Sequence, residues 1–190
     1  MGVETHWTML GLTVRSLSFP GREAGSLGSL VYQLHHEPSA FGLGKVTSEA
    51  QQALHIAAHL DSIDRIIAPA MQRGEVVLLD RFWWSTWVYG RAAGANVSTL
   101  DGLIGAERSH WGDRLPTAVV LLQRPAPFRP ELPNSTWRRL TALYENLATN
   151  EASSHPVLRI ANVAAIDETV SRVIHELQQF MDNPHRPHVA

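Results

Sequence analysis

Two short apolar runs constrain the fold of this chain more than any other feature. The first, EVVLLD, covers residues 75–80, and the second, TAVVLLQ, covers residues 117–123. Each run has the length of a strand and no polar alternation, which is typical of a parallel strand covered on both faces. Helical patterns lie before, between and after them, as parallel crossovers require. The sequence therefore predicts an α/β fold: a three-layer parallel sheet with helices on both faces.

The remaining elements continue this alternation of strands and helices within one predicted domain, residues 1–190. Pro69 should kink or shorten the longest helix, and Ser135 is the predicted N-cap of a later one. Four prolines in residues 124–134 exclude regular structure there, and the tail 183–190 should fray. Further strands are predicted at 12–18 and 157–162, and helices at 24–37, 47–73, 81–90, 100–111, from 135 onward and at 166–181.

The amino-acid composition excludes several classes of protein and of binding partner. The formal net charge is −2, which gives no long-range attraction to nucleic acid. The chain has no cysteine, so disulfides, thiolate nucleophiles and cysteine-ligated zinc are excluded. No apolar run approaches the roughly 18 residues of a membrane span, and no signal segment opens the sequence. These features predict a cytoplasmic protein without a membrane partner.

Charged residues follow two of the predicted strands. Arg22 comes shortly after the strand at 12–18, and Asp80 and Arg81 end the strand at 75–80. The carboxyl ends of parallel strands meet at one edge of a sheet, where ligands bind. We therefore expect these three side chains to converge, and arginine suits phosphate oxygens.

Two other groups of residues have competing interpretations. His55 and His59 have the i, i+4 spacing of a metal-binding pair, but no third ligand is evident. We favour an ordinary helix face and predict no metal ligands. The aromatic cluster around Trp83, Trp84 and Trp87 could stack on a base, but core or dimer packing is the favoured interpretation.

The segments SFPGREAGSLGSLVYQL and ALHIAAHLDSIDRIIAPAMQRGEVVLLDRFWWSTWVYG resemble thymidylate kinase, and PTAVVLLQR, RRLTALYENLA and VLRIANVAAIDETVSRVIHEL follow in the family's order. The resemblance covers roughly residues 12 to 182, and its most specific part is the Asp-Arg pair. It implies the fold of the P-loop nucleoside monophosphate kinases. It also implies transfer of the ATP γ-phosphate to dTMP or a related nucleotide with Mg²⁺, and a homodimer.

The same resemblance assigns roles to individual residues. Arg22 would hold the acceptor monophosphate. Asp80 would lie near that phosphate and the magnesium, with Arg81 as its partner on the phosphates, and these two are the candidate catalytic residues. Phe82 stands where the family has tyrosine. Phe19 and Tyr89 are further substrate-binding candidates, and Arg124 and Arg129 are candidates for a lid formed by residues 124–134. The positions matching the family's base-reading pair are Ile56 and Leu60, which carry no polar group. His59 or Tyr89 could contribute instead.

The N-terminal residues depart from the family pattern. The fragment GVETHW resembles the end of the family's phosphate-binding loop, but Val3 stands where lysine is expected and Glu4 where a magnesium-binding hydroxyl is expected. The central strand of the family also has no counterpart. Its two neighbours would then either pair with each other or leave open edges, as in a truncated form of a longer protein, which we favour. We expect poor phosphate transfer; the alternative is a non-catalytic relative that binds a nucleotide or a partner.

Overall fold

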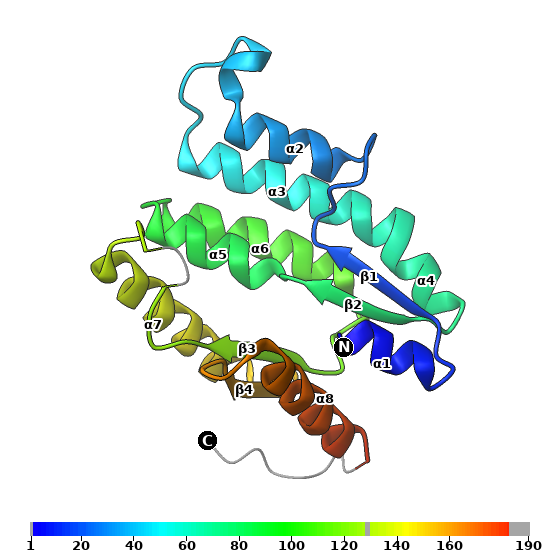
Figure 1. Cartoon of the computed structure of the whole chain (residues 1–190). Helices are drawn as coiled ribbons and strands as arrows, with labels where there is room; N and C mark the ends of the chain where they lie inside the picture. Colours follow the sequence, from blue (N-terminus) through cyan, green and yellow to red (C-terminus); the bar gives the residue numbers. More distant parts are fainter. Residues whose placement is uncertain (1, 128–129, 183–190) are drawn as a thin grey trace. The chain divides into compact units, whose positions relative to one another are not determined.

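The computed structural model describes residues 2–127 and 130–182. The chain divides into two compact units, where the sequence predicted one domain. The inner unit is Leu12–Asp113, and the terminal unit combines Met1–Gly11 with Arg114–Ala190. Each is described by itself below (Figure 1).

The inner unit contains a pair of parallel strands and a group of helices, and it carries every charged residue that the sequence singled out at strand ends. Strands β1 and β2 pair in parallel over their whole length, with Ser18 opposite Asp80 at the carboxyl end. Helix α3 packs against α2, α5 and α6. The elements are β1 (Val14–Ser18), α2 (Leu27–His36), η1 (Pro38–Phe41), α3 (Ser48–Ser62), η2 (Ile63–Ile67), α4 (Ala68–Gln72), β2 (Val76–Asp80), α5 (Trp83–Ala92) and α6 (Val97–Trp111).

The terminal unit has a second parallel pair, β3 with β4. Helix α8 packs against β4, and α1 packs against α8. Its buried side chains include Leu140 and Leu147 from α7 and Leu177 from α8. The elements are α1 (Val3–Met9), β3 (Val119–Gln123), α7 (Asn134–Glu151), β4 (Val157–Ala161) and α8 (Ile166–Asp182).

The α/β fold with parallel strands is confirmed, and the two apolar runs are the strands β2 and β3. Within each unit, however, the two described strands have only each other as strand neighbours. Most of their side chains are half-buried, and Leu122 is 48% exposed. A strand with a single strand neighbour does not need to be as apolar as β2 and β3 are.

The helix boundaries follow local capping. The side-chain oxygens of Ser26, Thr47 and Asn96 each accept a hydrogen bond from the amide three residues later, which starts α2, α3 and α6. Helix α2 therefore begins at Leu27, later than the predicted residue 24. The predicted cap at Ser135 is wrong: α7 already begins at Asn134, after Pro133. Proline fits there because the first helical turn needs no amide donor within the helix.

The predicted helix over 47–73 is continuous but not uniform. It runs as α3, then as a π-helical segment at Ile63–Ile67, then as α4. Pro69 lies in the first turn of α4. Proline has no amide to bond the carbonyl four residues earlier, and a wider π turn is a known way to absorb that defect. The predicted kink thus takes the form of a local change in helix type.

The core of the inner unit lies beneath the carboxyl end of β1. Leu17 and Phe19 from this end pack with Ile63, Ile67 and Trp111, and Val77, Leu79 and Phe82 contact the same cluster. The residues that follow β1 and β2 therefore start from a rigid base. No helix among the described residues is long and apolar enough to cross a bilayer.

Candidate functional site

The candidate site begins where β1 and β2 end. The amide of Phe19 donates to the carbonyl of Asp80 at 3.0 Å, which extends the parallel pairing one residue beyond β1. Arg22 follows four residues after Ser18, and Arg81 follows Asp80 directly. Both arginines therefore leave the same end of the two-stranded sheet, and Asp80, Arg22 and Arg81 are all exposed.

A tight turn connects β1 to Arg22. Gly21 has a φ of 111°, which only glycine adopts readily, and its amide donates to the carbonyl of Ser18. The hydroxyl of Ser62 on α3 donates to the carbonyl of Pro20. Gly28 in the first turn of α2 approaches so closely that an added Cβ would lie 2.5 Å from the carbonyl oxygen of Gly21. Two helices thus fix the turn from which Arg22 projects.

Arg81 is held in an uncommon backbone conformation. Its φ is 80°, the one positive value among the described residues other than glycine. A side chain in the left-handed region costs on the order of 1–2 kcal/mol. Strain of this kind persists where the surrounding structure imposes it, and it concentrates at functional positions.

Each arginine lies over a tyrosine ring. The guanidinium carbon of Arg22 is 4.6 Å from the ring centroid of Tyr32 on α2, and that of Arg81 is 5.8 Å from the ring centroid of Tyr89 on α5. Both distances are within the range of cation–π attraction. The tyrosines orient the guanidinium groups and leave their edge N–H donors available for an anion.

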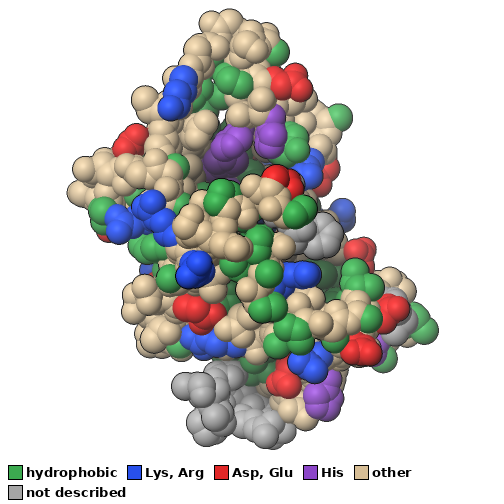
Figure 2. All heavy atoms as spheres, turned by 60° about the vertical axis from the view of Figure 1, so that its left-hand side comes forward, with side chains coloured by type: hydrophobic (Ala, Val, Ile, Leu, Met, Phe, Trp, Pro, Cys, Tyr) green, Lys and Arg blue, Asp and Glu red, His purple; other side chains and the backbone are tan. Residues whose placement is uncertain are grey.

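Histidine rings connect Tyr32 on α2 with α3. The ring of His36 lies 4.1 Å from that of Tyr32, and the ring of His35 lies 5.5 Å from that of His55 on α3. Figure 2 shows histidine side chains gathered in a hollow in the upper part of the surface, where α2 and α3 lie. The contacts therefore run without a break from Arg22 through α2 to α3.

Burial and nearby positive charge lower the pKa of two of these histidines. Burial, followed by the positive charges of His59, His35, Arg81 and His36, lowers the pKa of His55 from 6.5 to about 4. Burial and then His36 lower the pKa of His35. Both shifts reduce the tendency of these two imidazole rings to carry a positive charge.

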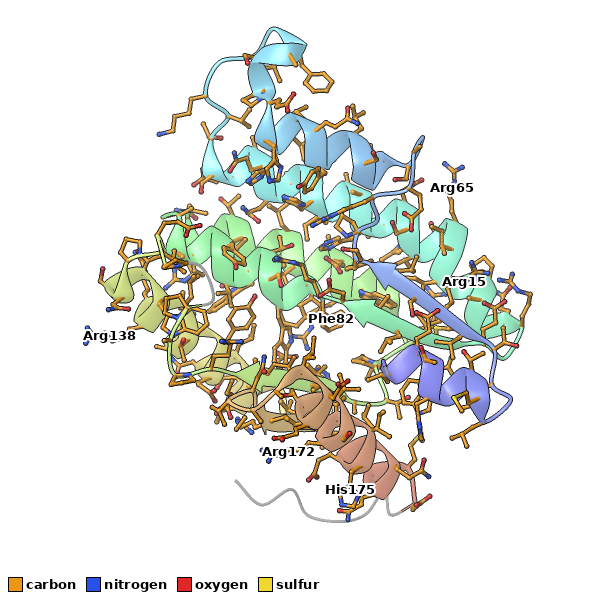
Figure 3. All side chains as sticks on the ribbon, viewed as in Figure 1. Arg15, Arg65, Phe82, Arg138, Arg172 and His175 are labelled. Atoms are coloured by element: carbon orange, nitrogen blue, oxygen red, sulfur yellow. The ribbon has the colours of Figure 1, made fainter. Side chains whose placement is uncertain are left out.

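Two of the three predicted aromatic ligand residues, Phe19 and Phe82, pack in or against the core. Phe19 is only 3% exposed, and its ring stacks on His59 with 4.1 Å between centroids. Phe82 is half-buried, and its ring lies 5.8 Å from those of Trp83 and Trp111. Figure 3 shows Phe82 directly after the tip of β2, whereas Arg15 and Arg65 lie away from that tip. Phe19 is therefore part of the core beneath the end of β1, and its contact with a substrate stays a prediction.

The other candidate residues have different positions. Tyr89 is exposed beside Arg81. Ile56 is buried, and its neighbour Leu60 is half-buried. Arg124 is exposed in the terminal unit, and Arg129 lies outside the described residues, as does part of the predicted lid segment.

Sequence reasoning did not identify Tyr32, His35 and Glu107 as part of this region. Tyr32 and His35 lie three apart on α2, the spacing of one helix face, which was the available signal. Glu107 carried no signal because its partner His59 is 48 residues away in the chain. Trp83 and Trp84 are each 3% exposed, which confirms the packing interpretation for those two residues.

Comparison with known proteins finds similarity in sequence and in fold. No protein-family profile matches the chain. It is 37% identical over 84 residues to the thymidylate kinase of Xanthomonas euvesicatoria, which is 44% of this chain and 34% of that enzyme. It is 33% identical over 122 residues to the thymidylate kinase of Nitrobacter winogradskyi, which is 63% of this chain and 51% of the relative. The matched part thus spans about a third to a half of these curated relatives.

A solved structure extends the likeness to nearly the whole chain. The thymidylate kinase of Ehrlichia chaffeensis superposes with a TM-score of 0.67 over 93% of this chain and 86% of its own, at 18% identity. The fold is therefore that of the nucleoside monophosphate kinases. More particularly, the residues that the sequence comparisons match are similar to those of thymidylate kinases.

Proposed function

We propose that the inner unit binds a nucleoside monophosphate, dTMP or a close relative, at the carboxyl ends of β1 and β2, and that the chain is a nucleotide kinase-like protein. One observation carries the proposal. Arg22 and Arg81 leave the same end of a parallel strand pair, and each is oriented by a tyrosine. Two guanidinium groups supply paired donors for phosphate oxygens. Likeness to thymidylate kinases supports the choice of nucleotide.

The acceptor phosphate would lie between the two guanidinium groups. Phosphoryl transfer depends on charge neutralisation and positioning, and the protein contributes little covalent chemistry. Arg22 and Arg81 would neutralise the monophosphate and hold its oxygens in place. Asp80 would lie beside Arg81 and balance its charge. The neutral pair His35 and His55 would offer uncharged ring surface to the remainder of the nucleotide.

The described residues fit ATP and Mg²⁺ less well than they fit the acceptor phosphate. Gly2 precedes α1, and the next two residues are Val3 and Glu4, which supply neither an ammonium group nor a hydroxyl. Lys45, the single lysine of the sequence, follows η1 in the inner unit. No group of three or more histidine, aspartate or glutamate residues in the described part of the chain could hold a metal ion. We therefore derive no transfer step.

A second candidate function follows from this difference. The chain would be a nucleotide-binding relative that does not transfer phosphate. Val3 and Glu4 favour it, since Glu4 would repel the donor phosphates. Nucleotide binding and phosphate transfer are measured in separate assays. The same protein tested in both assays therefore distinguishes the two candidate functions.

Calorimetric titration tests the binding proposal. The unsubstituted chain should bind dTMP, and Arg22→Gln should weaken binding by about 10- to 150-fold, the value of one charge-assisted hydrogen bond. Arg15→Gln is the matched control, because Arg15 is an exposed arginine on β1 whose Nε donates to Glu75 at 3.3 Å. Equal losses in both variants would show that the arginines act through overall charge and not through a site.

A further inference from the structure

A buried network lies behind the turn that carries Arg22. Glu107 on α6 has no exposed surface, and its Oε2 lies 2.6 Å from Nδ1 of His59 on α3. Its Oε1 accepts from Nε1 of Trp111 at 3.1 Å. An ionised carboxylate only accepts hydrogen bonds, so it would pair with the tautomer of His59 that carries a proton on Nδ1. Both carboxylate oxygens therefore hold an aromatic side chain in a fixed orientation.

The orientation of His59 determines where Phe19 lies. The two rings are stacked, with an interplanar angle of 21°. Phe19 is also fixed from the other side, because its amide donates to the carbonyl of Asp80. A rotation of the His59 ring would remove the surface on which Phe19 rests.

The turn after Phe19 is short, so a displacement of Phe19 reaches Arg22. Only Pro20 and Gly21 lie between them. Ser62 holds the carbonyl of Pro20 from α3, three residues after His59 on the same helix. His59 and Ser62 thus support the turn from one face of α3.

We propose that Glu107 is a positioning residue of the monophosphate site: it orients His59, on which Phe19 stacks, and thereby fixes the turn that presents Arg22. The inference rests on the proposed function for its consequence in binding, but the positioning itself does not. Burying a carboxylate is unfavourable unless hydrogen bonds compensate it. Here both compensating donors belong to rings of the same core, so the carboxylate determines the geometry of that core.

The test uses backbone amide and histidine ring nitrogen NMR on the whole chain. In Glu107→Gln the side chain keeps its size, and its amide can accept from Trp111 while donating to Nδ1 of His59. The proton of His59 should then move to Nε2, and the amide signals of Gly21 and Arg22 should shift. Ile104→Val is the matched control, a buried change one turn earlier on α6 that should leave those signals unchanged.

His59→Gln provides an independent second variant. The introduced amide N–H can still donate to the Glu107 carboxylate, so that carboxylate keeps a partner, but the ring beneath Phe19 is lost. The same signals should shift, and this variant decides the question if Glu107→Gln does not fold. Unmoved signals of Gly21 and Arg22 in every folded variant would overturn the proposal.

Binding of dTMP adds a second readout. Glu107→Gln should weaken it about tenfold, which is part of one charge-assisted hydrogen bond. In an Arg22→Gln background the further loss should nearly vanish, because Glu107 acts through Arg22. Additive losses would overturn the proposal. Failure of the unsubstituted chain to bind dTMP would overturn the proposed function alone, since the NMR signals still decide the positioning.

Discussion

Gly28 offers the sharpest test of how the turn before Arg22 is held. A Cβ at this position would lie 2.5 Å from the carbonyl oxygen of Gly21, and 2.7 Å and 2.9 Å from the carbonyl oxygen and carbon of Pro20. These are backbone atoms, so no flexible side chain can move aside. The turn or the start of α2 would have to move by several tenths of an ångström or more.

The expected cost of Gly28→Ala follows from this crowding. Overpacking in a well-packed region destabilises by about 1–3 kcal/mol. Alanine gains at most about 1 kcal/mol in helix propensity, and less in the first turn. We therefore expect Gly28→Ala to lower the free energy of unfolding by about 1–2 kcal/mol, and to weaken dTMP binding because the turn presents Arg22.

Gly102→Ala is the matched control. Gly102 is an exposed residue inside α6, and a Cβ there meets nothing within 4 Å. The same substitution should therefore raise the free energy of unfolding by about 0.5–1 kcal/mol. Urea denaturation followed by circular dichroism measures both variants, with midpoints compared at equal slope. If Gly28→Ala were as stable as Gly102→Ala, the close approach of α2 to the turn would be refuted.

Three further predictions concern Arg81, His55 and phosphate transfer. Arg81→Gly should be more stable than Arg81→Ala by about 1 kcal/mol, because only glycine adopts a φ of 80° without strain. Both variants should lose the proposed phosphate contact. Equal urea midpoints of the two variants would contradict the strain at Arg81. The pKa of His55 in the folded chain is about 4, below its ordinary value of 6.5. Between these two pH values the unfolded chain therefore binds more protons than the folded chain. The contribution of His55 to stability is present above pH 6.5 and is lost as the pH falls to about 4. The difference between these two pKa values corresponds to roughly 3 kcal/mol. The melting temperature of His55→Gln should therefore depend less on pH than that of the exposed control His175→Gln. Parallel curves for the two variants would count against a buried imidazole with a lowered pKa at His55. In a coupled assay with ATP and dTMP, the chain should transfer phosphate very poorly, since Val3 and Glu4 supply no donor-phosphate contact; robust turnover would show that another group performs this role.

The strands could be predicted because their signal is local. The apolar runs of β2 and β3 and the periodicity of α8 are visible within short windows of sequence. The π-helical segment at Ile63–Ile67 was not predicted as such, although Pro69 indicated a defect at that point. The start of α7 was misplaced because Asn134 and Ser135 are both polar residues that suit the beginning of a helix.

The site was less predictable because its contacts are not local. Arg22 and Arg81 could be proposed from strand ends alone, since parallel strands end at one edge. The stacking of Phe19 on His59 and the bond from His59 to Glu107 join residues 40 and 48 positions apart. No spacing in the sequence indicates such a pair, so the buried position of Phe19 could not be predicted.

Ligands with and without the phosphate group provide the most direct test of the proposed monophosphate site. Calorimetric titrations of the chain with dTMP and with thymidine, under the same buffer and salt, separate the contribution of Arg22 and Arg81 from that of the ring surface. The account predicts that dTMP binds at least about tenfold more tightly than thymidine, and that Arg22→Gln removes most of this difference. Equal affinities for dTMP and thymidine, or no binding of dTMP, would contradict a monophosphate site at the ends of β1 and β2.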